Sequence, residues 1–597
     1  MTNGDRRWMG RRRRLGACAA LKFVVVAMPA VFIAACTPPG LPDPIPPAAG
    51  SVVASMPAPV PQVTIGVDGT VRGFNPHAIA DYSPAAAAVA ALVLPGVSAV
   101  AADGSVQLNT DVVRQAEVTS TDPFTVTYTL DRNAAWSDGT PITAEDFSYL
   151  RDQMLVQPGT VDPAGYRLIS AIDSKNAGKT VEVTFTRAPA DWKTLFSPLL
   201  PAHLLKDSPG GWAEALTAGL PVSGNRYKMQ SYDTVTGEIT LVRNDKYWGT
   251  QPGPSVAVLR IGTSSALIEA LGRGDVDAVL LQPDGADQRT LEARTPVAQR
   301  VSVQLPGTVQ LVFDNLAGPT TDPAVRRAIA LALDLNSIRT VLDGGNAAGG
   351  TAAPSLVTLP GPPAGQPAPA AVPGAAGDSS AAVAELGRAG YTRQALYQRK
   401  DGKVLRLRLA YGTGDFRMAA AARLIQGQLA TSGVEVDLVR DDLRAVVGAR
   451  LALGTVDLGL LMVPRGSSDA LAAGSAFGCP QSAPAPRPAP APQATQTTQP
   501  TQATPPPGAA RTQPTPRAGH LSGFCAADIQ PLLEAASSGP IPPGLESALA
   551  AAVPTVQILR PSAVFATSSR LASVVAGSGP GWTFSTPLGG LANWPSK

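Results

Sequence analysis

Three dense Pro/Ala tracts, near residues 37–60, 359–377 and 480–517, interrupt a chain of 597 residues. Tracts of this composition bury too little apolar surface to offset the entropy cost of folding, so they do not join a packed core. The blocks between them differ, because 44% of the whole chain is hydrophobic and 16% is charged. The pattern predicts folded blocks separated by disordered insertions, and it excludes a wholly disordered or fibrous protein.

The first 35 residues are typical of a secretory leader. Six arginines within residues 6–14 precede an apolar run over 21–35, which leads through small residues to Cys36. The run is too short and too interrupted for a bilayer span. Because Ile-Ala-Ala-Cys over 33–36 resembles a bacterial lipobox, we expect cleavage before Cys36, lipidation of its thiol and a Pro-rich stalk over 36–60. The alternatives are a plain secreted protein or an uncleaved anchor, with Cys36 incidental.

Removal of residues 1–35 reverses the sign of the net charge. The full chain carries 48 Lys/Arg and 45 Asp/Glu, a formal charge of +3, and the leader holds seven of these bases and one acid. The mature chain therefore has 41 bases and 44 acids, a net charge of −3. With this balance and no basic face in the sequence, we expect no nucleic-acid partner.

Cys479 and Cys525 are the cysteines that remain besides Cys36, since Cys18 leaves with the leader. In an extracytoplasmic compartment, two leftover cysteines most economically pair. We predict a disulfide between them, at the two ends of the 480–517 tract, worth about 3–4 kcal/mol in the chain-entropy model. This disulfide would hold the two ends of the insertion against the folded body.

Local patterns predict a mixed α/β chain. Period-two alternation predicts strands over 63–67, 124–130, 181–186 and 239–242. A helix is predicted to begin at Thr143, with Asp146 at the third helical position, and another at Asp322, which precedes Pro323. A further helix is predicted over 381–388.

The block from about 311 to 550 contains a strand, a helix and a strand in that order. The strand is predicted over 404–409, the helix over 419–430 with Gly433 after it, and the next strand over 434–438. This order is a βαβ unit, so we expect a mostly parallel sheet. The segment 555–597 is again strand-like.

Six motifs then follow one another along the chain. They are YTL at 128–130 with WSDGTPITAEDF at 136–147, GNRYK at 224–228 with RNDKYWG at 243–249, ALGRGDVD at 270–277, DPAVRRAI at 322–329, LATSGV at 429–434 and GTVD at 454–457. In this order they resemble the family 5 extracellular solute-binding proteins, the peptide- and nickel-binding receptors of bacterial ABC importers.

The resemblance implies a periplasmic-binding-protein-like type II fold, with two α/β lobes, a hinge and an inserted subdomain in the first lobe. A ligand would lie in the cleft between the lobes. Trp136 is expected in the core rather than at the ligand, Asp138 in a tight turn, and Asp277 and Asp457 at strand entries. The expected boundaries are 61–310 for lobe I, with the subdomain at about 82–180, 311–550 for lobe II, with insertions 359–377 and 480–517, and 551–597 for the return to lobe I.

The ligand segment departs from the family pattern. Peptide-binding members carry a Trp-x-Ala-Asp-Tyr-x-Asp-Pro type segment shortly after the position of Asp457, whereas residues 461–470 here read LMVPRGSSDA without its Trp, Tyr and Asp-Pro. The three histidines, His77, His203 and His520, lack metal-site spacing, so we expect no nickel, no other metal and no cofactor. The lipobox, the stalk and the altered segment most resemble the LpqW-type lipoproteins of mycobacteria.

Five polar residues near the expected meeting of the lobes are our ligand-binding candidates, and a surface or hinge role is the alternative for each. They are Tyr82, Asp314, Asn315, Arg465 and Asp469.

We expect a non-enzyme, because the sequence holds no Gly-x-Ser-x-Gly elbow, His-Glu-x-x-His pair or phosphate-binding loop. The resemblance implies a protein lipid-anchored to the extracytoplasmic face of the membrane that acts in, or regulates, phosphatidylinositol mannoside and lipoarabinomannan synthesis. Its partners would be a glycolipid or a membrane mannosyltransferase. The alternative is a receptor that delivers peptides or another organic solute to an ABC permease.

Overall fold

The computed structural model describes residues 61–594 except 102–104, 295–296, 347–348, 354, 359–375, 480–519, 572–573 and 575–586. The predicted leader, Cys36 and the stalk lie outside the described residues, as do nearly all of the insertion at 359–377 and the whole of that at 480–517.

One twelve-stranded sheet runs through both lobes. Its order is β19 (Glu435–Asp441), β18 (Arg406–Gly412), β20 (Leu458–Pro464), β13 (Gly307–Phe313), β21 (Thr555–Thr567), β11 (Ala278–Leu281), β1 (Gln62–Asp68), β10 (Val256–Gly262), β9 (Glu238–Arg243) and β8 (Tyr227–Asp233), with β12 (Gln299–Gln304) and β14 (Gly350–Thr351) also paired to β21. We call the part built on β1 and β8–β11 lobe I, and the part built on β13 and β18–β20 lobe II.

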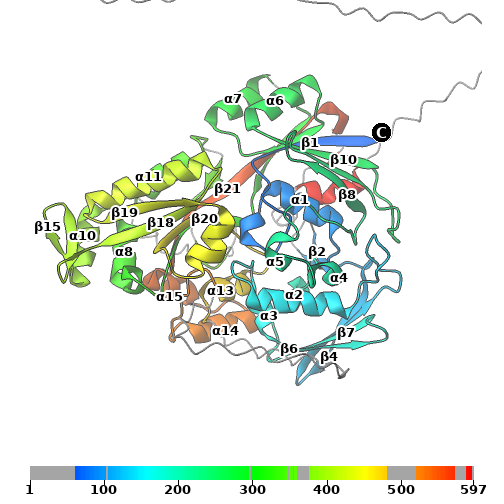
Figure 1. Ribbon diagram of the computed structural model, residues 1–597, viewed down its shortest axis with the longest axis horizontal. Helices are drawn as coiled ribbons and strands as arrows, with labels where there is room; N and C mark the ends of the chain where they lie inside the picture. The colour runs from blue at the N-terminus through cyan, green and yellow to red at the C-terminus, as the bar shows by residue number, and fades with distance from the viewer. Residues whose placement is uncertain are drawn as a thin grey trace, which may run out of the picture. The chain divides into compact units, whose positions relative to one another are not determined.

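Strand β21 joins the two lobes. Its first residues pair with β13 up to Leu559, and from Ser562 onward it pairs with β12, and then also with β11. Figure 1 shows this long strand passing between the two groups of strands. Because all thirteen of its residues are buried, the crossing at Arg560 and Pro561 lies inside the molecule. Leu305 crosses beside it and donates its N–H to the Pro561 carbonyl.

The sheet is mixed, so the expectation of a mostly parallel sheet is wrong. The predicted βαβ unit is present, and β18 pairs in parallel with β19 and with β20. However, β13 runs antiparallel to both of its neighbours, β20 and β21. The cause is that β21 returns from the far end of the chain, which no local pattern signals.

Helices pack against the strands of both lobes, and the helix starts follow from local capping. Asp322 accepts a hydrogen bond from the Ala324 N–H as the N-cap residue of α8, as predicted. The predicted helix over 419–430 is α11, which is longer at both ends. The long helices are α1 (Pro84–Val93), α6 (Ser264–Arg273) and α7 (Gly285–Arg294) in lobe I, and α8 (Pro323–Ala332), α9 (Leu335–Leu342), α10 (Ser379–Arg388) and α11 (Phe416–Thr431) in lobe II.

A smaller four-stranded sheet packs against a capped helix in the same hydrophobic core as lobe I. Thr143 and Asp146 form the predicted capping box at the start of this helix. Trp136 is fully buried in the core, as expected, and Asp138 closes the turn by accepting the Thr140 N–H. The elements are β4 (Val113–Thr121), β5 (Phe124–Leu130), β7 (Thr180–Phe185), β6 (Ile169–Lys175) and α2 (Ala144–Val156).

Three helices form a separate small core beside lobe II, where Phe477 and Phe524 pack edge to face. They are α13 (Asp469–Phe477), α14 (Gln530–Ser538) and α15 (Leu545–Ala552).

Short elements complete the described chain: β2 (Ser98–Val100), β3 (Val106–Leu108), β15 (Thr392–Gln394), β16 (Tyr397–Lys400), β17 (Lys403–Val404), α3 (Ala164–Arg167), α4 (Ala202–Leu205), α5 (Gly211–Glu214), α12 (Leu443–Ala445), the π-helical turn η4 (Val446–Leu451), and the 3-10 turns η1 (Ile79–Asp81), η2 (Trp192–Thr194), η3 (Pro319–Thr321), η5 (Ser569–Leu571) and η6 (Pro587–Asn593).

Candidate ligand site between the lobes

A pocket of about 60 Å³ lies between the lobes. Lobe I contributes Ile79 and residues 160–162, and the other wall comes from β13, β20, the end of α13 and Thr555. A space of this size holds a few water molecules or one small chemical group, well below the roughly 300–1,000 Å³ of pockets that enclose a whole organic ligand. The described conformation therefore leaves only a small space between the lobes, and most of its lining is apolar.

Asp162 supplies the ionisable group of the pocket. Its Oδ2 accepts a hydrogen bond from the Gly466 N–H across the lobes, and its backbone has a positive φ of 50°. Burial raises the pKa of Asp162 from 3.8 to about 6, and the positive charge of Arg465 opposes this rise. Thr160 Oγ1, in the same wall, is buried and has no hydrogen-bond partner among the described residues. An unpaired buried hydroxyl and a carboxylate on a strained backbone are features typical of binding sites rather than of cores.

An ion pair near the pocket joins the two lobes. Arg444 of α12 donates from Nε and Nη2 to Asp81 Oδ1, at 2.9 and 2.7 Å, and Asp81 is 3% exposed. Burial raises the pKa of Asp81, while the Arg444 guanidinium lowers it. A Cβ at Gly73 would lie 2.2 Å from Arg444 Nη2 and 2.3 Å from Asp81 Oδ2, so a side chain at position 73 would displace the ion pair. This pairing stabilises the closed arrangement.

Three of the sequence candidates do not line the pocket. Asp314 follows β13, and its Oδ1 accepts the Leu316 N–H to close a turn. Asn315 donates from Nδ2 to the carbonyls of Phe313 and Ser522, at 3.2 and 3.3 Å. The Tyr82 hydroxyl is buried without a hydrogen-bond partner among the described residues, and burial raises the pKa of Tyr82. The contacts of Asp314 and Asn315 support a structural role, and a ligand role for the three stays a prediction.

Arg465 and Asp469 lie next to the pocket and contact each other. Arg465 Nη2 donates to the carbonyl of Val357 and, at 3.2 Å, to Asp469 Oδ1. Arg465 directly follows the pocket residue Pro464 and is 8% exposed. Arg560 of β21, which sequence reasoning missed, is 4% exposed, and burial, then repulsion from Arg465, lowers its pKa. An arginine inside the apolar run 556–566 was the available signal.

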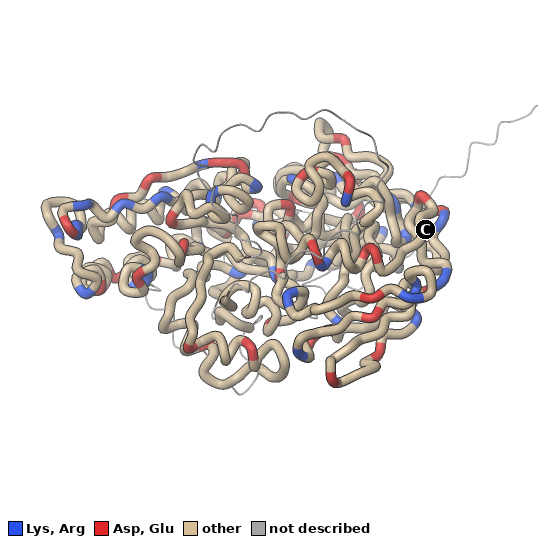
Figure 2. The backbone as a smooth tube through the Cα atoms, turned by 60° about the horizontal axis from the view of Figure 1, so that its bottom comes forward, with Lys and Arg blue, Asp and Glu red and all other residues tan. Residues whose placement is uncertain are grey.

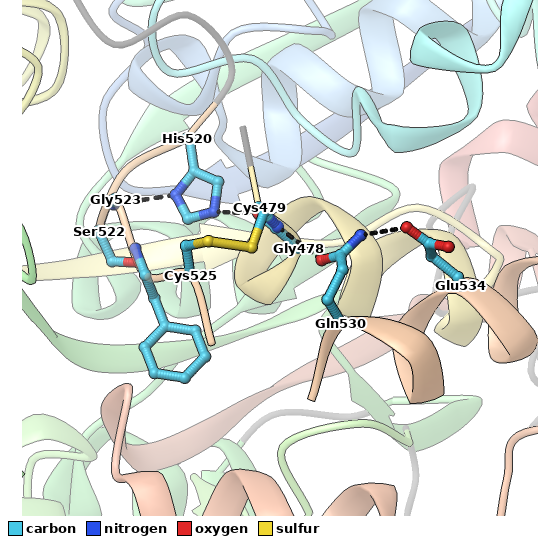
Figure 3. Close-up of a disulfide and its surroundings, with 9 residues drawn as sticks. Gly478, Cys479, His520, Ser522, Gly523, Cys525, Gln530 and Glu534 are labelled. Carbon is cyan, nitrogen blue, oxygen red and sulfur yellow. Dashed lines mark hydrogen bonds between the residues drawn. A yellow bond between two sulfur atoms is a disulfide. The ribbon is translucent and has the colours of Figure 1, made fainter. Parts of the chain in front are cut away.

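The predicted cysteine pair forms a disulfide in the structure, between Cys479 after α13 and Cys525 before α14. Figure 3 shows the bonds around it. The Cys479 N–H donates to Gln530 Oε1 at 2.8 Å, and His520 joins the Gly478 carbonyl to the Gly523 N–H. Because His520 Nδ1 accepts from Gly523, its Nε2 carries the proton that bonds to Gly478. Leu521 and Ser522 in this segment line the pocket, so the bridge fixes part of the pocket wall.

Charged residues of both signs are spread over the described part of the chain. Figure 2 shows Lys/Arg and Asp/Glu interspersed along the chain. The described part of the chain contains no cluster of three or more His, Cys, Asp or Glu residues that could hold a metal ion. Within the same described residues, no helix is both long and apolar enough to cross a membrane.

Residues 107–482 match the family model of the bacterial extracellular solute-binding proteins, family 5. The chain is 35% identical over 326 residues to the "Probable monoacyl phosphatidylinositol tetramannoside-binding protein LpqW" of Mycobacterium tuberculosis. The aligned region covers 53% of this chain and 51% of that protein. It is 27% identical over 379 residues to the oligopeptide-binding protein OppA of Mycobacterium bovis, covering 61% and 62% of the two chains. The chain thus spans about half to three fifths of the length of these relatives.

Solved structures show the same fold at low identity. The oligopeptide-binding protein AppA of Bacillus subtilis, solved with a nonapeptide, superposes with a TM-score of 0.67 at 16% identity, covering 90% of this chain and all of that one. The periplasmic EDTA-binding protein EppA gives a TM-score of 0.63 at 22% identity, covering 90% and 96%. These matches confirm the expected type II binding-protein fold. The chain belongs to family 5 of the bacterial extracellular solute-binding proteins, a family of binding proteins that act outside the cytoplasm.

Proposed function

We propose that this protein is a lipid-anchored solute-binding protein of the cell envelope that acts in, or regulates, phosphatidylinositol mannoside and lipoarabinomannan assembly without catalysing a reaction. The observation that carries the proposal is its 35% identity to a relative named for binding a monoacyl phosphatidylinositol tetramannoside. The segment 461–470 agrees with this, because it replaces the residues typical of peptide receptors with Arg465 and Asp469. The partner is a mannosylated lipid or a membrane mannosyltransferase.

The anchor and the domain organisation belong to the same proposal. Lipidation at Cys36 would tether the body through the stalk over 36–60 to the outer face of the membrane. The proposed body comprises lobe I over 61–310 and lobe II over 311–550, and 551–597 returns to lobe I. A Cys36→Ser variant is expected to leave the membrane fraction for the soluble extract, whereas a Cys18→Ser variant is expected to stay membrane-bound.

A second candidate function is that of an importer receptor for peptides. Similarity to the oligopeptide-binding protein OppA favours it, at 27% identity over 61% of this chain. A receptor of this kind would hand its solute to an ABC permease rather than to an envelope enzyme.

Mass spectrometry of solvent extracts separates the two functions. The full-length chain is purified from a mycolic-acid bacterium, and the bound material is compared with that from an unrelated lipoprotein purified in the same way. A stoichiometric phosphatidylinositol mannoside supports the envelope function, and its loss from the glycolipid profile of a deletion strain would strengthen it. Stoichiometric peptide, with an unchanged glycolipid profile after deletion, would contradict it.

A further inference from the structure

Two buried arginines lie where the chain crosses between the lobes. Arg560 is on β21, between the part paired with β13 and the part paired with β12 and β11. Arg465 directly follows β20 at the edge of the pocket. Both residues are more than nine-tenths buried, at 4% and 8% exposure. Both lie beside one segment, because the Arg465 N–H donates to the Pro306 carbonyl at 3.2 Å and the Leu305 N–H donates to the Pro561 carbonyl at 2.9 Å. Burial of two like charges in one region is costly unless each is paired.

The pairing of these two guanidinium groups is incomplete. Arg465 uses Nη2 for the Val357 carbonyl and for Asp469, but its Nη1 is buried and has no hydrogen-bond partner among the described residues. Arg560 Nε is likewise buried and unpartnered within the described part of the chain. A buried donor left unpaired costs about 1–3 kcal/mol, and more when it is charged. The described residues thus leave one donor of each arginine without an acceptor.

The nearby carboxylates do not supply the missing acceptors. Asp469 Oδ1 accepts from Arg465 Nη2 at 3.2 Å, and Asp162 Oδ2 accepts from the Gly466 N–H. Neither oxygen reaches Arg465 Nη1 or Arg560 Nε. Arg465 therefore keeps an unpartnered N–H group next to the pocket residue Pro464, and Arg560 keeps one at the crossing, while the pocket's own acid, Asp162, is already engaged across the lobes.

We propose that Arg465 and Arg560 together bind an oxyanion of the solute, a phosphodiester or a carboxylate, at the crossing between the lobes. The planar guanidinium presents several N–H donors that match the oxygens of such groups. In a buried site the interaction is stronger than in water, and it would neutralise the repulsion between the arginines. This inference rests on the proposed function as a solute-binding protein, and it names the chemistry that the solute must carry.

Isothermal titration of the full-length chain in detergent tests the proposal. The probes are sn-glycero-3-phosphoinositol with neutral myo-inositol as its control, and trialanine with trialanine amide as its control. The wild-type chain is expected to bind one anionic probe at least about ten times more tightly than its neutral control. Preference for the phosphodiester or for the carboxylate identifies the source of the anion.

We expect Arg560→Gln and Arg465→Gln each to weaken binding of that anionic probe at least about tenfold. Binding of the neutral control should not change. Arg388→Gln, on a side chain that is 70% exposed, is the matched control and should bind as wild type. Arg560→Lys keeps the charge and should retain part of the affinity, which separates lost charge from misfolding.

Equal binding of anionic and neutral probes, no binding of either anion, or unchanged affinity in Arg560→Gln would overturn the anion site. The proposed function fails on a different result, namely stoichiometric peptide in extracts of the purified chain together with an unchanged glycolipid profile after deletion.

Discussion

Among the residues that the structure describes, buried arginines lie at two places, in α8 and at the crossing between the lobes, and their hydrogen-bond partners differ. Arg326 of α8 is 4% exposed and donates to four carbonyls: Nε to Val553 at 2.9 Å, Nη1 to Thr320 and Thr321 at 2.9 and 3.0 Å, and Nη2 to Ala552 at 2.8 Å. Arg560 is buried to the same extent, yet its Nε has no partner among the described residues.

This difference in hydrogen bonding distinguishes an arginine that supports the fold from arginines that are available to bind a solute. Arg326 ties the start of α8 to the end of α15, so its donors are used by the fold itself. Arg560 and Arg465 lie at the crossing between lobes that move in binding proteins of this fold, and their free donors are available to a solute. Burial alone therefore does not assign a role to a charged residue; the partners of its donors do.

The largest expected effect is the loss of Arg326. Arg326→Met removes four hydrogen bonds and leaves buried carbonyls unpaired, so we expect the free energy of unfolding to fall by about 4 kcal/mol. Urea unfolding followed by circular dichroism measures it. The matched control is Arg327→Met, whose side chain is 40% exposed, and we expect a loss below about 1 kcal/mol. Equal losses in the two variants would remove the basis of the comparison.

Asp162 predicts a pH dependence of stability. Its pKa is raised from 3.8 to about 6, so between these values the folded state binds the proton more tightly than the unfolded state. This contribution to stability is complete below about pH 4 and is lost as the pH rises to about 6, by about 2–3 kcal/mol. Asp162→Asn should remove this decline, measured as the difference from wild type in urea unfolding at pH 4, 5, 6 and 7. Parallel curves would show that Asp162 does not carry the effect.

Arg444 stands between Arg326 and Arg560, because its guanidinium donates to a partner, Asp81, that lies on the other lobe. Arg444→Met should disfavour closure by about 1 kcal/mol and raise the radius of gyration of the unliganded protein in small-angle X-ray scattering. Arg450→Met removes an ion pair to Asp441 within lobe II and serves as its control, with no expected change in radius. An unchanged radius in Arg444→Met would mean that other contacts hold the lobes closed.

Loss of Arg560 should have the smallest effect on stability. Arg560→Met removes a buried charge whose Nε is unpaired, so we expect the free energy of unfolding to change by less than about 1 kcal/mol in either direction. The same urea assay as for Arg326→Met measures it. A loss close to that of Arg326→Met would indicate that Arg560 supports the fold.

Local features of the fold were predictable from the sequence, and long-range ones were not. The capping box at Thr143 and Asp146 and the strand over 124–130 depend on neighbouring residues, and the structure contains both. The predicted strand over 404–409 is interrupted, because Val404 pairs with the β16 hairpin and β18 begins at Arg406. The antiparallel placement of β13 depends on a strand more than two hundred residues away.

The candidate site follows the same rule. Arg465 and Asp469 lie four residues apart at the start of α13, and the sequence analysis named both. Asp162 reaches the Gly466 N–H, next to Arg465, only across the lobes. Arg560 comes near Arg465 only because β21 and the residue after β20 bond to the adjacent residues Leu305 and Pro306. No sequence spacing predicts that these residues lie near one another. An arginine within an apolar strand does, however, indicate a position whose charge needs a partner.

A crossed stability measurement tests the central claim, that Arg326 serves the fold and Arg560 serves the solute. Unfolding of wild type, Arg326→Met and Arg560→Met is followed with and without the anionic probe that wild type binds, at one hundred times its Kd. We predict that the probe stabilises wild type and Arg326→Met by about 2.7 kcal/mol each, and Arg560→Met by much less, although Arg560→Met is the more stable variant without it. Equal stabilisation of all three proteins would contradict the account.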